Sequence, residues 1–226
     1  WMGSDAFFVF DGTVRKLPCT VEDFVFDEID TTQYEQVWAG SNSAYGEVWW
    51  FYCSTASNQV DKYVIWNYQE NLWYTGSLDR STWIDSGTYP LPYATKYDGT
   101  NSTLFIHESG KDDDGSTMTS FIESGDFDIG SGDDILFINK VIPDFKGQVG
   151  NVNVSLKSRY FPTDTQTVKG PFRYSTSSTK INTRTRGRQV AVRLESNGFD
   201  DINNDATGED WRLGTIRFEV QPDGKR

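Results

Sequence analysis

Two stretches decide the fold class of this chain: TRTRGRQVAVRLES at residues 183–196 and WRLGTIRFEVQPDGKR at residues 211–226. In both, an apolar residue recurs at every second position: Val190, Val192, Leu194, Ile216, Phe218 and Val220. Alternation with a period of two places one set of side chains on a core and the other set in solvent. Both stretches therefore predict half-buried strands, and the Asn-, Asp- and Gly-rich residues between them predict a loop.

The composition of the whole chain extends this prediction to an all-β fold. The 226 residues are 15% aromatic and include 20 glycines, and short alternating runs recur throughout. Aromatic and β-branched residues favour strands, while Gly marks the turns between them. No apolar run approaches the roughly 20 residues that a membrane-crossing helix needs. The two cysteines, Cys19 and Cys53, are too few for a disulfide framework or a zinc site, so we expect two buried free thiols.

Residues 1–115 predict blade-like units of a partial β-propeller. The sequence WMGSD at residues 1–5 recurs as WAGSN at residues 38–42, and an aromatic run follows each copy. Short strands that repeat at a period near 40 residues are typical of propeller blades. Two to three such units cannot close a ring, so we expect an upstream segment to complete it. The alternative is a meander of hairpins that repeats a common turn.

Residues 116–226 predict a second domain with longer strands. About six alternating runs follow Met118, enough for a β-sandwich-like domain. The sequence thus predicts a domain boundary near Ser116.

Charge is distributed unevenly along the chain. Residues 1–144 hold 7 Lys and Arg against 24 Asp and Glu, whereas residues 145–226 hold 14 against 9. Four cations of the second part fall on the polar faces of predicted strands: Lys157, Arg159, Arg193 and Arg217. We expect them to form a basic surface that contacts a partner, although scattered solubilising charges would have the same pattern.

The residues give little support for catalysis or for a cofactor. His107 is the single histidine and has no nucleophile motif beside it, so we expect a structural role. The loop Asp201–Asp205 has calcium-like spacing but lacks the turn glycine and the closing glutamate, and an acidic cluster at residues 126–134 has no known spacing. The aromatic residues between Trp49 and Tyr74 could stack on sugars, but strand aromatics are more often buried. The sequence predicts neither catalytic residues nor a resident cofactor or metal.

The order of several short motifs resembles one protein family. They are Gly187–Val190, Glu195–Ser196, Trp211–Thr215, Gln221–Arg226, Glu47–Tyr52, Asp126–Gly130 and Ile142–Phe145. In this order they resemble the tail nozzle, or tail tubular, proteins of short-tailed bacteriophages, also described as packaged-DNA stabilisation proteins. The resemblance covers most of the chain, but no single motif carries chemistry.

The resemblance implies a structural virion protein rather than an enzyme. It would be a tail nozzle subunit in a hexameric ring below the portal and the tail adaptor, assembled in the host cytoplasm. It would form part of the DNA-ejection conduit and help to retain packaged DNA. The acidic charge of the first part separately suggests that part of this acidic surface faces the lumen, where like charge would repel DNA. The alternative is a phage-associated propeller lectin or glycan-degrading enzyme. A soluble DNA-binding domain fits poorly with the acidic first part.

Overall fold

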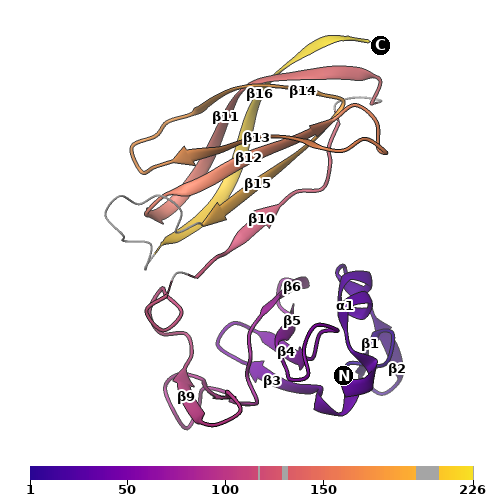
Figure 1. Cartoon of the computed structure of the whole chain (residues 1–226), viewed down its shortest axis with the longest axis vertical. Helices are drawn as coiled ribbons and strands as arrows, with labels where there is room; N and C mark the ends of the chain where they lie inside the picture. Colours follow the sequence, from indigo (N-terminus) through magenta and orange to yellow (C-terminus); the bar gives the residue numbers. More distant parts are fainter. Residues whose placement is uncertain (117, 129–131, 197–208, 226) are drawn as a thin grey trace. The chain divides into compact units, whose positions relative to one another are not determined.

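The chain is all-β, with 55% of residues in strands and 6% in helices. The structure is a computed structural model that describes residues 1–116, 118–128, 132–196 and 209–225. It divides into two compact units, Trp1–Ser109 and Gly110–Arg226 (Figure 1). The division falls a few residues before Ser116, where the texture of the sequence changes. Within the described residues, none of the sheets closes on itself.

The first unit contains three antiparallel sheets of short strands. They are ordered β1-β2, β3-β4-β5-β6 and β7-β8-β9, so within each sheet consecutive strands are neighbours. The strands are β1 Phe7–Phe10, β2 Val14–Leu17, β3 Trp38–Asn42, β4 Glu47–Tyr52, β5 Lys62–Asn67, β6 Leu72–Ser77, β7 Thr82–Ile84, β8 Tyr93–Tyr97 and β9 Ser102–Ile106. A short α-helix, α1 Glu22–Glu28, and a 3-10 helix, η1 Thr31–Gln36, connect β2 to β3.

Aromatic side chains fill both faces of the β3–β6 sheet. On one face Trp50, Tyr52, Val64 and Trp73 pack with Phe7 of β1 and Val25 of α1. On the other face Trp49, Phe51 and Ile65 pack with Trp83 of β7. The alternation of β4 thus serves two cores, which explains why EVWWFY is apolar at nearly every position.

The expected repeat is not a structural one. Residues 38–42 form β3, but residues 1–5 form no strand and contribute only an isolated bridge between Met2 and Phe7. Between these two segments lies α1, and its Val25 is fully buried. Tertiary packing outweighs local similarity here, because each copy of the motif meets different neighbours.

The second unit contains two antiparallel sheets of longer strands. Their orders are β10-β15-β12-β13 and β14-β11-β16. The strands are β10 Phe121–Glu123, β11 Asp134–Val149, β12 Val152–Arg159, β13 Thr167–Tyr174, β14 Ile181–Gly187, β15 Gln189–Ser196 and β16 Asp210–Lys225. The strands predicted at residues 189–195 and 215–220 lie within β15 and β16.

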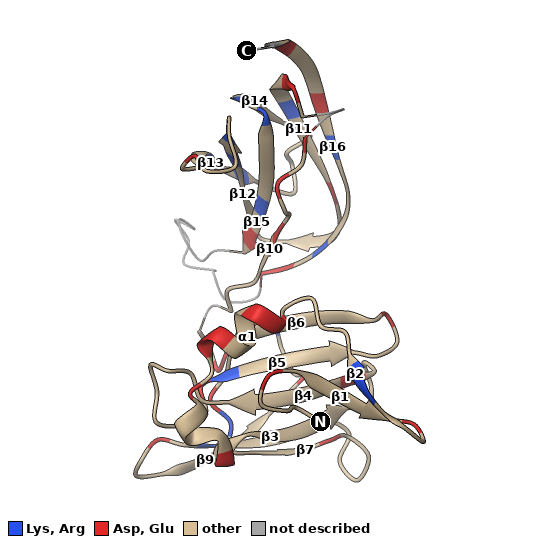
Figure 2. Ribbon diagram, turned by 90° about the vertical axis from the view of Figure 1, so that its right-hand side faces the viewer, with Lys and Arg blue, Asp and Glu red and all other residues tan. Residues whose placement is uncertain are grey.

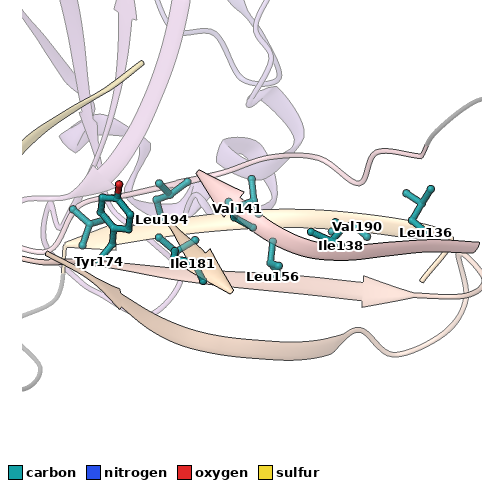
Figure 3. Packing of buried hydrophobic residues seen from close by; sticks show 11 residues of the cluster. Leu136, Ile138, Val141, Leu156, Tyr174, Ile181, Val190 and Leu194 are labelled. Atoms are coloured by element: carbon teal, nitrogen blue, oxygen red, sulfur yellow. The ribbon is translucent and has the colours of Figure 1, made fainter. Parts of the chain in front are cut away.

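One aliphatic core lies between these two sheets. Leu136, Ile138 and Val141 of β11 meet Leu156 of β12 and Leu194 of β15 (Figure 3). Burial alternates strictly along β12, so every second residue is buried. The period-two pattern therefore sets which side chains enter the core and which remain outside.

Candidate functional site

Three of the four predicted partner-contact cations lie together on the outer face of one sheet. Lys157 and Arg159 alternate with the buried residues of β12, and Arg193 does so on β15. Lys157 pairs with Ala191 and Ser155 pairs with Arg193, so the cations occupy nearby positions on adjacent strands. The predicted strand faces are correct for these three residues.

Glu123 of β10 holds two of these cations. Its carboxylate oxygens lie 2.5 Å from Lys157 Nζ and 3.0 Å from an Arg193 guanidinium nitrogen. Arg193 also donates two hydrogen bonds to Glu195, and its guanidinium lies 3.9 Å from the centre of the Phe121 ring. Burial alone would raise the pKa of Glu123, but the hydrogen bonds and charges of Lys157 and Arg193 outweigh it and lower that pKa.

The other two cations are also paired with carboxylates. Arg159 forms an ion pair with Asp126 and donates a hydrogen bond of 2.9 Å to Gln189. Arg217 lies on β16 of the other sheet, 3.9 Å from Asp144, and both side chains are largely exposed. The structure therefore brings three of the four residues together and separates Arg217 from them.

The expected basic surface is a charge-balanced one. Three of its carboxylates, Glu123, Asp126 and Asp144, come from before residue 145, whereas the fourth, Glu195, and the four cations come from after it. The two-sheet fold places these parts of the sequence side by side, and charges of both signs occur along β15 and β16 (Figure 2). Residues 110–226 together hold 16 Lys and Arg against 18 Asp and Glu. The charge asymmetry of the sequence is thus compensated inside the second unit, and contact with a partner stays a prediction.

A pocket in the first unit was not anticipated from the sequence. It has a volume of about 580 Å³ and is lined by η1, the start of β3, the loop at residues 58–60, residues 79–81 and the end of β8. Two aromatic side chains, Trp38 and Tyr97, line it together with amides, two carboxylates and Arg80. Trp38 stacks on Phe51 with ring centres 4.2 Å apart. No sequence motif marks this pocket, because its lining comes from five separate segments.

Arg80 joins the pocket to the single histidine. Arg80 is only 5% exposed, and its Nε donates a hydrogen bond of 3.0 Å to His107 Nε2. The imidazole packs on the Trp83 ring, and the guanidinium lies over Phe105. Asp79 accepts from Arg80 and also lies 2.5 Å from Lys96 Nζ. His107 therefore accepts a hydrogen bond in a packed network, and its structural role stays a prediction.

Neither acidic loop can be assigned as a cation site. The calcium-like loop at residues 201–205 lies outside the described residues. At the other cluster Asp126 is engaged by Arg159 and Gln166. Among residues that the structure describes, no three His, Cys, Asp or Glu side chains are grouped to hold a metal ion.

The aromatic residues of β4 to β6 are core residues and offer no broad sugar platform. Trp49, Trp50, Tyr52 and Trp73 are each at most 9% exposed, whereas Tyr74 is exposed. Both cysteines are free, and Cys53 is buried as expected. Cys19 is only half-buried, which corrects the expectation of two buried thiols.

No protein-family model matches the chain, and no curated protein matches it. Over the described residues, no helix has both the length and the apolar character needed to cross a membrane.

Proposed function

We propose that this chain is a tail nozzle subunit of a short-tailed bacteriophage, a structural virion protein that forms part of the DNA-ejection conduit. The observation that carries the proposal is the stacking of three successive antiparallel sheets in the first unit. Each sheet has its strands in sequence order, as blades of a propeller do. The motif order along the chain supports the same family.

The contacts between these sheets are those expected of neighbouring blades. The first strand of one sheet, β3, meets the first strand of the next, β7, because the Trp83 indole lies against Gly40 and donates to the Ser41 carbonyl at 2.8 Å. Ser41 Oγ also donates to Asp85 at 2.8 Å. In the proposed partial propeller, β3–β6 is a complete four-stranded blade and β7–β9 supplies three strands of the next.

The proposed propeller explains an uncovered apolar surface on β7–β9. The side chains of Ile84, Leu104 and Ile106 are 56%, 63% and 53% exposed. Ile84 of β7 and Ile106 of β9 both pair with Tyr93 of β8, so they lie on either side of it. A further blade would cover such a face. In the second unit, two sheets around one aliphatic core support a β-sandwich-like platform domain.

In this proposal the subunits form a hexameric ring in the virion tail, in contact with the tail adaptor and other tail proteins. The first unit holds 5 Lys and Arg against 15 Asp and Glu. Acidic surface facing the lumen would repel DNA and let it pass without sticking. The network around Arg159 and Arg193 lies on a different unit and faces neighbouring subunits in this proposal.

The proposal is tested by reversing Arg159, Arg193 and Arg217 to Glu in the full-length tail protein. We expect ring or tail assembly, followed by electron microscopy, to be impaired while DNA affinity at physiological salt stays unchanged. Normal assembly with a loss of salt-dependent DNA binding would contradict it, because the face would then be a nucleic-acid site.

A second candidate function, glycan binding, is favoured by the pocket in the first unit. Aromatic rings, amides and carboxylates at one site can stack on a sugar ring and bond its hydroxyls. A glycan array probed with the wild type and with Trp38→Ala would test it. Binding that Trp38→Ala abolishes would favour glycan recognition, and slow cleavage of a bound polysaccharide would favour a glycan-degrading enzyme.

A further inference from the structure

The outer strand of the second unit carries a free edge with a self-complementary sequence. β16 is the last strand in the order β14-β11-β16, and among the described residues it pairs with β11 alone. Its central segment, TIRFEVQ at residues 215–221, contains no proline. An unpaired strand edge presents free backbone N–H and C=O groups that another strand can join.

The sequence of this segment is complementary to itself when two copies pair in antiparallel orientation. When two copies run antiparallel with Phe218 opposite Phe218, Ile216 lies opposite Val220 and Arg217 lies opposite Glu219. The residue at one end, Thr215, then faces Gln221 at the other. Apolar residues meet apolar ones, and each cation meets an anion twice because of the two-fold symmetry.

The exposure of these side chains agrees with such pairing. Arg217 is exposed, with its guanidinium 3.9 Å from Asp144, and Glu219 is nearly half exposed although it bonds Lys140 and Asn139. Ile216, Phe218 and Val220 pack against the core but are only partly buried, unlike the residues of central strands. A strand added beside β16 would cover this open flank of the core.

Charge also selects one register. A shift that centres the pairing on Arg217 places two arginines opposite each other, and a shift that centres it on Glu219 places two glutamates opposite each other. Like charges directly opposite each other destabilise a strand pair. Registers shifted by one residue place core side chains against polar ones and are excluded by the alternation of β16.

The opposite sheet has an edge strand of a different character. β13 carries Lys169 and Pro171, and Pro cannot donate a backbone hydrogen bond. Charges and prolines on an edge discourage pairing with other chains. Residues 215–221 also carry two charges, Arg217 and Glu219, but these are complementary across a two-fold axis, and no proline removes a backbone donor before Pro222.

We propose that two copies of this chain associate through antiparallel pairing of β16, centred on Phe218. The contact joins two three-stranded sheets into one continuous sheet. It goes beyond the nozzle function and does not depend on it, because neighbours in a six-fold ring are not related by two-fold axes. The contact therefore joins two separate rings or two free chains.

The test measures the dimer dissociation constant of the full chain by sedimentation equilibrium at low salt. The wild type is expected to dimerise in the micromolar range. Arg217→Glu and Glu219→Arg should each weaken dimerisation at least tenfold, since each places like charges opposite each other. Arg212→Glu, a change of the same charge on the same strand outside the paired segment, is the control and should leave dimerisation unchanged.

The decisive result comes from variants in which opposite charges face each other again. The double variant R217E/E219R should dimerise like the wild type, and an equal mixture of the two single variants should form a heterodimer. Restoration also shows that the substituted chains fold. A wild type that is monomeric at 100 µM, single variants that dimerise normally, or a mixture without heterodimer would each overturn the proposal. If these variants still form rings, the proposed nozzle function stands, whatever the dimerisation measurements show for β16.

Discussion

The cores of the two units contain different kinds of side chain, largely aromatic in the first unit and aliphatic in the second. The first has strands of at most six residues, and its buried side chains include Phe7, Trp50, Tyr52 and Trp73. The second has strands of up to 16 residues and a core dominated by Val, Leu and Ile. Short strands have few inward positions, so each must bury a large side chain to fill the space between sheets. Long strands reach the same burial through many small contributions.

This difference concentrates stability in single residues of the first unit. Phe7 is fully buried, and its ring centre lies 4.8 Å from that of Trp73 and 5.0 Å from that of Trp50. It joins β1 to two strands of the neighbouring sheet. Leu156 is equally buried in the second unit but is one of many aliphatic residues around it.

The largest expected effect comes from Phe7→Ala, which should cost about 3–5 kcal/mol of unfolding free energy. Its matched variant in the other unit, Leu156→Ala, should cost about 2–5 kcal/mol. Tryptophan fluorescence separates them, because seven of the eight tryptophans lie in residues 1–109 and Trp211 alone lies in the second unit. Urea unfolding followed by fluorescence should shift strongly for Phe7→Ala and little for Leu156→Ala. Equal shifts would show that the two units unfold together and would break the comparison.

The next effect tests the packing between sheets of the first unit. A Cβ added at Gly40 would lie 2.8 Å from the Trp83 ring, so Gly40→Ala must displace that indole. We expect a loss of about 1–3 kcal/mol, read from thermal unfolding and near-UV circular dichroism. Gly125→Ala is the control in the second unit, because a Cβ there meets no atom within 4 Å. A neutral Gly40→Ala would mean that β3 and β7 do not pack closely.

A smaller effect is expected at alkaline pH. Burial raises the pKa of Cys19 from 9.0 to about 11. The unfolded chain therefore releases this proton first, so stability is retained below pH 9 and falls between pH 9 and 11. Since the thiol is half-buried, we expect a loss of only about 1 kcal/mol. Unfolding midpoints of the wild type and Cys19→Ser from pH 8 to 11 should converge as pH rises, and parallel curves would contradict this.

The smallest effect is expected in the charge network of the second unit. Glu123→Gln removes a charge held by Lys157 and Arg193 and should cost about 0.5–1 kcal/mol at pH 7. Because the pKa of Glu123 is lowered in the folded state, this difference should disappear as pH falls below 4.5. Urea titrations of both proteins at pH 7 and pH 3 would measure it. A difference that persists at pH 3 would indicate lost packing rather than lost charge.

The sequence allowed us to predict which side chains of a strand face the core, but not which strands lie next to each other in a sheet. The faces of β12, β15 and β16 follow directly from a period of two in the sequence, because that period is a property of the strand itself. The strands β3, β7, β8 and β14 were missed, since they are short or lack a regular alternation of apolar and polar residues. The sequence Thr183–Gly187 shows this well: Thr183 and Thr185 are buried beside the core while the arginines point outward.

The candidate site was predicted only in part for the same reason. Strand faces placed Lys157, Arg159 and Arg193 correctly, but their carboxylate partners come from residues 123–126 and 195. The contact of Arg193 with Glu195 is local to β15, but the contacts with Glu123 and Asp126 depend on which segments are neighbours, and local sequence does not encode this. The pocket around Trp38 and Arg80 was missed entirely, since its lining is assembled from segments far apart in the sequence.

The pairing of β11 with β16 sets an order of events during synthesis. The two strands enclose β12 to β15 in the sequence, so β11 leaves the ribosome well before its partner exists. Until β16 is made, β11 has only the shorter strand β14 beside it, and one flank of the core stays uncovered. Contacts so distant in sequence form slowly because a long loop must close first. The second unit therefore completes its fold only after β16 has emerged, and its aliphatic core strands stay partly uncovered during that interval.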